Sequence, residues 1–80
     1  MTLNQLGMNR PGDIVGVGGR DALAQRLMAL GFLPGARVTI VQVAPFGDPI
    51  TVELDGWRVS LRRAEAASLA VEPRGEESSS

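Results

Sequence analysis

The 80-residue sequence contains no cysteine, histidine, tyrosine or lysine. Without cysteine and histidine, the chain can form no disulfide framework, no thiolate or imidazole catalyst, and no zinc or iron site with nitrogen and sulfur ligands. A divalent cation would have to be held by carboxylate and carbonyl oxygens, which select poorly for transition metals. We therefore expect no cofactor and at most weak intrinsic binding of such metals.

The charge balance excludes a further group of partners. All eight positive side chains are arginines, nine side chains are acidic, and the formal net charge is −1. Nucleic acids and anionic membrane surfaces attract strongly basic proteins, so we expect neither to be a partner. The longest apolar stretch, Leu27 to Leu33, is too short to span a bilayer, and the N-terminus does not resemble a signal peptide. These features predict a cytoplasmic protein with no direct membrane insertion.

The length and composition predict one small domain. Hydrophobic residues make up 44% of the chain, and turn-forming Gly and Pro residues divide it into segments of strand length. We expect the domain to occupy residues 1–73. Residues 74–80 read RGEESSS and contain no apolar side chain, so we expect a disordered polar tail there.

One longer segment has the features of a helix. Asp21 can accept hydrogen bonds from the first free amide groups, residues 22–30 are mostly good helix formers, and Gly31 can adopt the left-handed conformation that ends a helix. At 100° per residue, three leucines share one face and are expected to face the core. They are Leu23, Leu27 and Leu30.

The remaining segments alternate with the two-residue period of strands. Residues 50–54 and 57–61 alternate apolar and polar side chains on either side of Asp55-Gly56, which predicts a tight hairpin. Trp57 falls on its apolar face. Further strands are expected at 14–17, 37–43 and 69–71, with a helical turn at 64–67; apolar residues on both faces of 37–43 predict a bulge. The fold class is mostly β: a small five-stranded barrel with one α-helix after the first strand and a short helical turn before the last.

Two candidate sites have a stronger structural than chemical interpretation. The glycine-rich run Gly16 to Gly19 matches no phosphate-binding motif, and Asp21 would repel a phosphate, so we interpret the run as a turn. Only carboxylates are left for acid–base work or metal binding. Asp48, Glu53 and Asp55 lie on or beside one predicted hairpin, where solvated acids are also expected. We predict that the chain is not an enzyme.

The most informative candidates for function are on predicted surfaces. Met28 projects away from the leucine stripe, beside Ala24, and with Leu33 it could form an exposed apolar patch for a protein partner or for a second copy of the chain. Arg62 and Arg63 form an adjacent pair of like charges that could anchor an acidic partner, although most such pairs are merely solvated. The predicted partner-binding residues are Ala24, Met28, Leu33, Arg62 and Arg63.

Three segments, taken together, resemble one known family. They are LMALGFLPGARV at residues 27–38, APFGDPITVEL at 44–54 and VSLRRAEAASLAVEP at 59–73. In this order and spacing they are similar to the ferrous iron transport protein A (FeoA) family, and the likeness covers roughly residues 2–73. The resemblance implies an SH3-like barrel in the cytoplasm.

The resemblance also implies a function and a partner. FeoA-like proteins are accessory modules of bacterial ferrous iron uptake that act on the permease FeoB, which carries a cytoplasmic GTPase domain. Docking onto FeoB by protein contact is then the leading hypothesis, with recruitment to the inner face of the membrane. The alternatives are an iron carrier or sensor built on Asp48, Glu53 and Asp55, and the SH3-like module of an iron-dependent regulator, although no DNA-binding helices precede the domain here.

Overall fold

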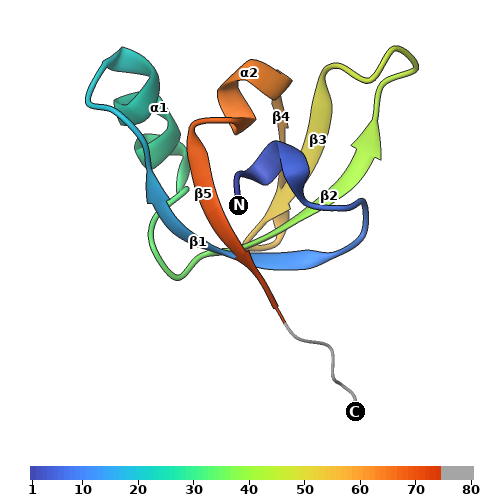
Figure 1. Ribbon diagram of the computed structural model, residues 1–80, viewed down its shortest axis with the longest axis horizontal. Coiled ribbons are helices and arrows are strands. Elements are labelled where there is room, and N and C mark those ends of the chain that lie inside the picture. The colour runs from blue at the N-terminus through green and yellow to red at the C-terminus, as the bar shows by residue number, and fades with distance from the viewer. Residues whose placement is uncertain (75–80) are drawn as a thin grey trace.

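The computed structural model describes residues 1–74 and contains a single five-stranded antiparallel sheet (Figure 1). The elements in chain order are the 3₁₀-helix η1 (Leu3–Gln5), β1 (Pro11–Val17), α1 (Ala22–Leu30), β2 (Arg37–Val43), β3 (Ile50–Leu54), β4 (Trp57–Leu61), α2 (Arg63–Ala66) and β5 (Leu69–Pro73). The strand order across the sheet is β4-β3-β2-β1-β5. The expected fold class, with one helix after the first strand and a short helix before the last, is confirmed.

Two irregularities bend the sheet into its SH3-like form. The register shifts between Ile14 and Gly16 where β1 pairs with β5, and between Ile40 and Gln42 where β2 pairs with β3. Extra residues of this kind increase the local twist and bend a strand. The bulge expected in the strand at 37–43 is therefore present. At the two outer strands, α2 connects β4 to β5, and η1 packs against both α2 and β5.

The β3–β4 hairpin has the predicted bounds. Asp55 (φ 50°) and Gly56 (φ 92°) both have positive φ, as a two-residue type I′ turn requires. The alternating pattern was wrong about Trp57, whose side chain is 47% exposed although Leu54, its partner across the hairpin, is buried. The reason is that β4 is an outer strand, so Trp57 has a neighbouring strand on one side only.

The ends of α1 form as the sequence predicts. Asp21 Oδ1 accepts the Ala24 N–H at 3.0 Å, and Gly31 adopts the left-handed conformation (φ 111°). The Phe32 N–H donates to the Leu27 carbonyl at 3.1 Å, and the Phe32 side chain is buried. The chain therefore turns back sharply after the helix and places Phe32 in the core.

The buried face of α1 differs from the expected leucine stripe. Ala24 and Leu27 are fully buried, whereas Leu23 and Leu30 are only half-buried against the core. Ala24 was predicted to belong to a docking surface, and that prediction is wrong because no part of its side chain reaches solvent. A small side chain lets a helix backbone lie close to its neighbours, so the buried face is centred between Ala24 and Leu27.

Other boundaries shift by a few residues. β1 begins at Pro11 rather than 14, the helical turn covers 63–66, β5 continues to Pro73, and η1 was not predicted. The folded body also includes Arg74, which was expected in the tail: its guanidinium pairs with Asp13 at 3.0 Å. The rest of that tail, 75–80, lies outside the described residues. Within 1–74, no helix is long and apolar enough to cross a membrane.

Candidate functional site

The candidate docking residues are divided between the two sides of α1. Arg26 and Met28 are two positions apart, so they project about 200° from one another around the helix axis, on either side of the buried Leu27. The Arg26 side reaches α2, because Arg26 pairs with Glu65. The Met28 side therefore faces away from α2. Met28 and Arg62 therefore do not lie on one surface.

We call Met28 and Leu33 the apolar patch. Their side chains are 40% and 49% exposed, and both belong to α1 or the turn that follows it. Two backbone hydrogen bonds fix this turn: the Leu33 N–H donates to the Gly31 carbonyl at 2.8 Å, and the Ala36 N–H donates to the Leu33 carbonyl at 2.9 Å. The patch is thus presented on an ordered turn. Exposed apolar side chains that gather in one place are typical of protein contacts.

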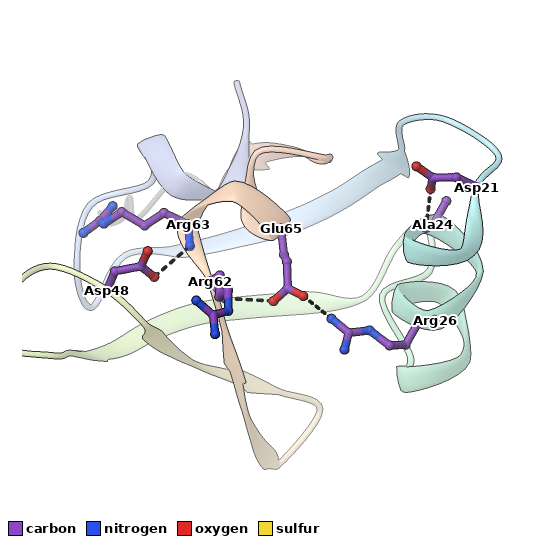
Figure 2. A network of polar contacts seen from close by, with 7 residues as sticks. All are labelled: Asp21, Ala24, Arg26, Asp48, Arg62, Arg63 and Glu65. Atoms are coloured by element: carbon purple, nitrogen blue, oxygen red, sulfur yellow. Dashed lines mark hydrogen bonds and ion pairs between the residues drawn. The ribbon is translucent and has the colours of Figure 1, made fainter.

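We call Arg26, Asp48, Arg62, Arg63 and Glu65 the polar junction (Figure 2). Glu65 is its centre, because one carboxylate oxygen accepts the Arg62 N–H at 2.9 Å and the other accepts a hydrogen bond from the Arg26 guanidinium. The first of these bonds caps the N-terminus of α2. The second joins α1 to α2, so Glu65 fixes the position of one helix relative to the other.

Arg63 connects three segments of the chain. Its N–H donates to Asp48 Oδ1 at 3.0 Å, its Nε donates to the Gly47 carbonyl, and its Nη1 donates to the Asn4 carbonyl at 3.4 Å. The side chain is half-buried. These contacts hold the loop before β3, the start of α2 and η1 together. The guanidinium of Arg63 is therefore engaged within the fold rather than presented to a partner.

Arg62 has the opposite environment. Its side chain is exposed, and within residues 1–74 its guanidinium has neither a hydrogen bond nor an ion pair. It lies at the rim of an open cavity of about 490 Å³ between the polar junction and β4. The cavity is lined by Arg26, Asp48, Pro49, Ser60, Leu61, Arg62 and Glu65. The lining holds two arginines and two carboxylates, and within residues 1–74 Arg62 is the one of these four whose side chain has no hydrogen bond or ion pair, because Arg26 pairs with Glu65 and Asp48 accepts the Arg63 N–H.

The carboxylates required by the iron-carrier hypothesis are not gathered together. Asp48 accepts from Arg63, Glu53 lies opposite Arg58 on the hairpin, and Asp55 occupies the hairpin turn. In the part of the chain that the structure describes, no three acidic side chains form a group that could hold a metal ion.

The glycine run at residues 16–19 serves the fold. It closes β1 and leads into α1, and the Gly18 N–H donates to the Ser68 carbonyl at 2.7 Å. Asp21, just beyond it, caps α1. One backbone amide of the run and the first acidic side chain after it are thus already engaged, in agreement with its interpretation as a turn.

Sequence reasoning did not identify Arg26 and Glu65 as parts of a site. Glu65 could have been found, because an acidic residue three positions after the N-cap residue, here Arg62, is half of a capping box. Arg26 carries no such signal. It is 39 positions from Glu65 in the sequence, and only the packing of α1 beside α2 brings the two together.

Comparison with known proteins identifies relatives over almost the whole domain. The FeoA domain family matches residues 1–73. The Fe(2+) transport protein A/Fe(2+) transporter FeoB fusion protein of Porphyromonas gingivalis is 39% identical over 72 residues, which are 90% of this chain and 8% of the fusion protein. The chain thus spans only a small part of that relative.

Two solved structures have the same fold and recognisable sequence identity. Iron(II) transport protein A of Clostridium thermocellum is 37% identical with a TM-score of 0.88, over 94% of this chain and 46% of the other. FeoA of Stenotrophomonas maltophilia, an SH3 domain protein solved as a zinc complex, is 34% identical with a TM-score of 0.81, over 90% and 89% of the two chains. With the family match at residues 1–73, these similarities establish that the chain belongs to the FeoA domain family.

Proposed function

We propose that this protein is a non-enzymatic accessory module of ferrous iron uptake that binds and regulates the permease FeoB by protein contact. The observation that carries the proposal is the fusion relative, in which a domain 39% identical to this chain is part of one polypeptide with FeoB. Covalent linkage keeps two modules at high effective concentration, as suits modules that act on one another. Contact with FeoB would recruit this domain to the cytoplasmic face of the membrane.

The apolar patch is the surface we assign to this contact. Met28 and Leu33 are exposed, Met28 lies on α1 and Leu33 in the turn that follows it, and backbone hydrogen bonds hold this turn. Buried apolar anchors supply most of the affinity in protein interfaces, whereas exposed charges at the rim supply little. Of the two arginines predicted to assist, Arg62 alone has a guanidinium without a partner among residues 1–74, and it lies on the other side of α1.

The proposal is tested by capture of the cytoplasmic domain of FeoB from the same organism on the immobilised protein. Met28→Asp places a charge at the centre of the patch and is expected to abolish capture. Met8→Asp is the matched control, since Met8 is 55% exposed in the loop between η1 and β1. Equal capture by both variants would remove the apolar patch from the proposal, and no capture by the unaltered protein would overturn the proposal itself.

Two further measurements separate the alternatives. Gel filtration detects a dimer that Met28→Asp dissociates, the result expected if the patch packs against a second copy. Anaerobic calorimetry with ferrous iron tests the carrier hypothesis. Because Asp48 is engaged with Arg63 and the described residues hold no group of three acids, we expect no tight binding to the monomer.

A further inference from the structure

The outer edge of β4 is open to an additional strand. Among the described residues β4 pairs with β3 alone, and the two-residue turn makes Leu54 and Trp57 the first hydrogen-bonded pair of the hairpin. Because bonded and non-bonded pairs alternate along an antiparallel ladder, the backbone groups of Arg58 and Ser60 point away from β3. Both residues are exposed, and no backbone partner occupies these groups in residues 1–74. This edge thus offers two N–H and two C=O groups for pairing.

Two of the side chains along this edge are positively charged, and within residues 1–74 neither forms an ion pair, although Glu53 lies opposite Arg58 across the hairpin. Arg58, Ser60 and Arg62 occupy alternate positions, and Arg62 keeps an extended backbone (φ −73°, ψ 150°), so all three project to the same side. Within the described residues, neither arginine has a hydrogen bond or an ion pair. Ser60 and Arg62 also line the open cavity beside the polar junction. The edge therefore combines free backbone groups, free positive charge and space for side chains.

Two kinds of strand could pair with this edge, a second copy of β4 and an acidic peptide, and the positive charge of Arg58 and Arg62 favours the peptide. A second copy of the chain that paired with β4 about Ser60 would place Arg58 of one copy opposite Arg62 of the other, and like charges that face each other across a ladder are destabilising. An acidic strand would instead place carboxylates beside both arginines. The two arginines are four residues apart, which is about 13 Å along a strand.

We propose that the outer edge of β4 binds an extended acidic peptide segment, which adds to the sheet as a sixth strand and sets its carboxylates against Arg58 and Arg62. Backbone hydrogen bonds to Arg58 and Ser60 supply the pairing, and the alternation of acidic side chains supplies the selectivity. This surface is separate from the apolar patch. The acidic segment need not belong to FeoB. The proposal for the β4 edge and the proposal that the apolar patch binds FeoB can therefore fail independently.

The experiment is an NMR titration of the ¹⁵N-labelled protein with seven-residue synthetic peptides. The acidic peptide alternates Asp and Val, and a second peptide alternates Lys and Val. A third has the acidic sequence with N-methyl groups on the backbone nitrogens of one edge, which removes the pairing but keeps the charge. We expect the acidic peptide to shift the Arg58 and Ser60 amide resonances and to protect those amides from hydrogen exchange. The other two should bind at least about tenfold more weakly.

Matched variants test the charge. Arg62→Glu is expected to weaken the acidic peptide about tenfold, and Arg62→Gln by less. Arg20→Glu is the control, because Arg20 is another exposed arginine without a partner in 1–74, in the loop before α1. Raising the salt concentration should weaken binding to the unaltered protein but change little for Arg62→Glu.

Several results would overturn the proposal. Equal binding of the acidic and N-methylated peptides would indicate attraction by charge without strand pairing. Resonance shifts centred on Met28 and Leu33 would place the peptide on the apolar patch instead. An unchanged affinity in both Arg62 variants, or no binding of any peptide, would also contradict the proposal. A β4-mediated dimer, detected by analytical ultracentrifugation of the protein alone, would show that a second copy occupies the edge instead.

Discussion

The two sides of α1 differ in what their exposed side chains already contact. On the Arg26 side, charged groups from α1, α2 and the loop before β3 bond to one another, and the result is a junction that fixes the fold. On the Met28 side, Met28 and Leu33 are exposed and apolar, and the turn that presents them is held by backbone hydrogen bonds. The charged groups between α1 and α2 therefore stabilise the domain's own structure, whereas the exposed apolar groups on the other side of α1 remain available to a partner.

Arg62 and Arg63 repeat this contrast within two residues. They were predicted as one docking pair because they are adjacent and alike. In the fold, Arg63 is half-buried and donates to the carbonyls of Gly47 and Asn4, whereas Arg62 is exposed and its guanidinium has no partner in the part of the chain that the structure describes. Adjacent residues at the end of a strand point to opposite sides, so neighbours in sequence need not share a surface.

The largest expected effect on the free energy of unfolding is at the buried face of α1. Ala24→Asp would place a charge where nothing reaches solvent, at a cost of about 4 kcal/mol or more, which is comparable to the whole stability of a domain of this size. We expect this variant to be largely unfolded by circular dichroism and urea titration. A well-folded Ala24→Asp protein would mean that the side of the helix bearing Ala24 is not packed as described.

The next effect separates Arg63 from Arg62. Arg63→Ala removes the side-chain bonds to two backbone carbonyls, so we expect its free energy of unfolding to fall by about 2 kcal/mol. Arg62→Ala should stay within about 0.5 kcal/mol of the unaltered protein. Urea unfolding of the two variants side by side checks this pair, and equal losses would contradict the division of roles.

A smaller effect is expected at the centre of the polar junction. Glu65→Ala removes the cap on the Arg62 N–H and the pair with Arg26, and should lower the free energy of unfolding by about 1 kcal/mol. Part of the loss should disappear at high salt, where the exposed ion pair is screened. Arg26→Gln keeps the cap and is the control, with a loss that is smaller and entirely salt-dependent.

The smallest effect on stability is expected at the apolar patch. Met28 is 40% exposed and on the rim of the buried face, so Met28→Asp should lower the free energy of unfolding by no more than about 1 kcal/mol, through partial loss of burial and an acidic side chain in the last turn of α1. Thermal unfolding followed by circular dichroism measures it. A large loss would show that Met28 belongs to the core and would make the variant unsuitable as a binding probe.

The sequence predicted the structure correctly where the conformation depends on residues that are close in the sequence. Asp21 and Gly31 fixed the ends of α1, and Asp55-Gly56 fixed the hairpin, because each acts through backbone groups a few residues away. Predictions that depended on packing were weaker. The helical angle places Ala24 on the surface and strand alternation places Trp57 on the apolar face, yet Ala24 is buried and Trp57 is exposed, since neither pattern includes the position of a neighbouring element.

The candidate site was predicted only in part for the same reason. Met28 and Leu33 are exposed as predicted, because Met28 lies on α1 outside the buried face that contains Leu27, and Leu33 follows in the turn after the helix. The polar junction could not be predicted, because the partners of Arg63 are as many as 59 positions away.

The proposed contact between the apolar patch and FeoB can be tested by measuring the affinity of the protein for the cytoplasmic domain of FeoB. Calorimetric titrations should compare the unaltered protein with Met28→Asp, Met8→Asp and Arg62→Glu, each first shown to be folded. If the apolar patch is the contact, Met28→Asp weakens binding at least about tenfold, while Met8→Asp and Arg62→Glu change the affinity by less than about threefold. Loss of binding in Arg62→Glu with full binding in Met28→Asp would contradict this prediction, because the contact would then lie on the opposite side of α1.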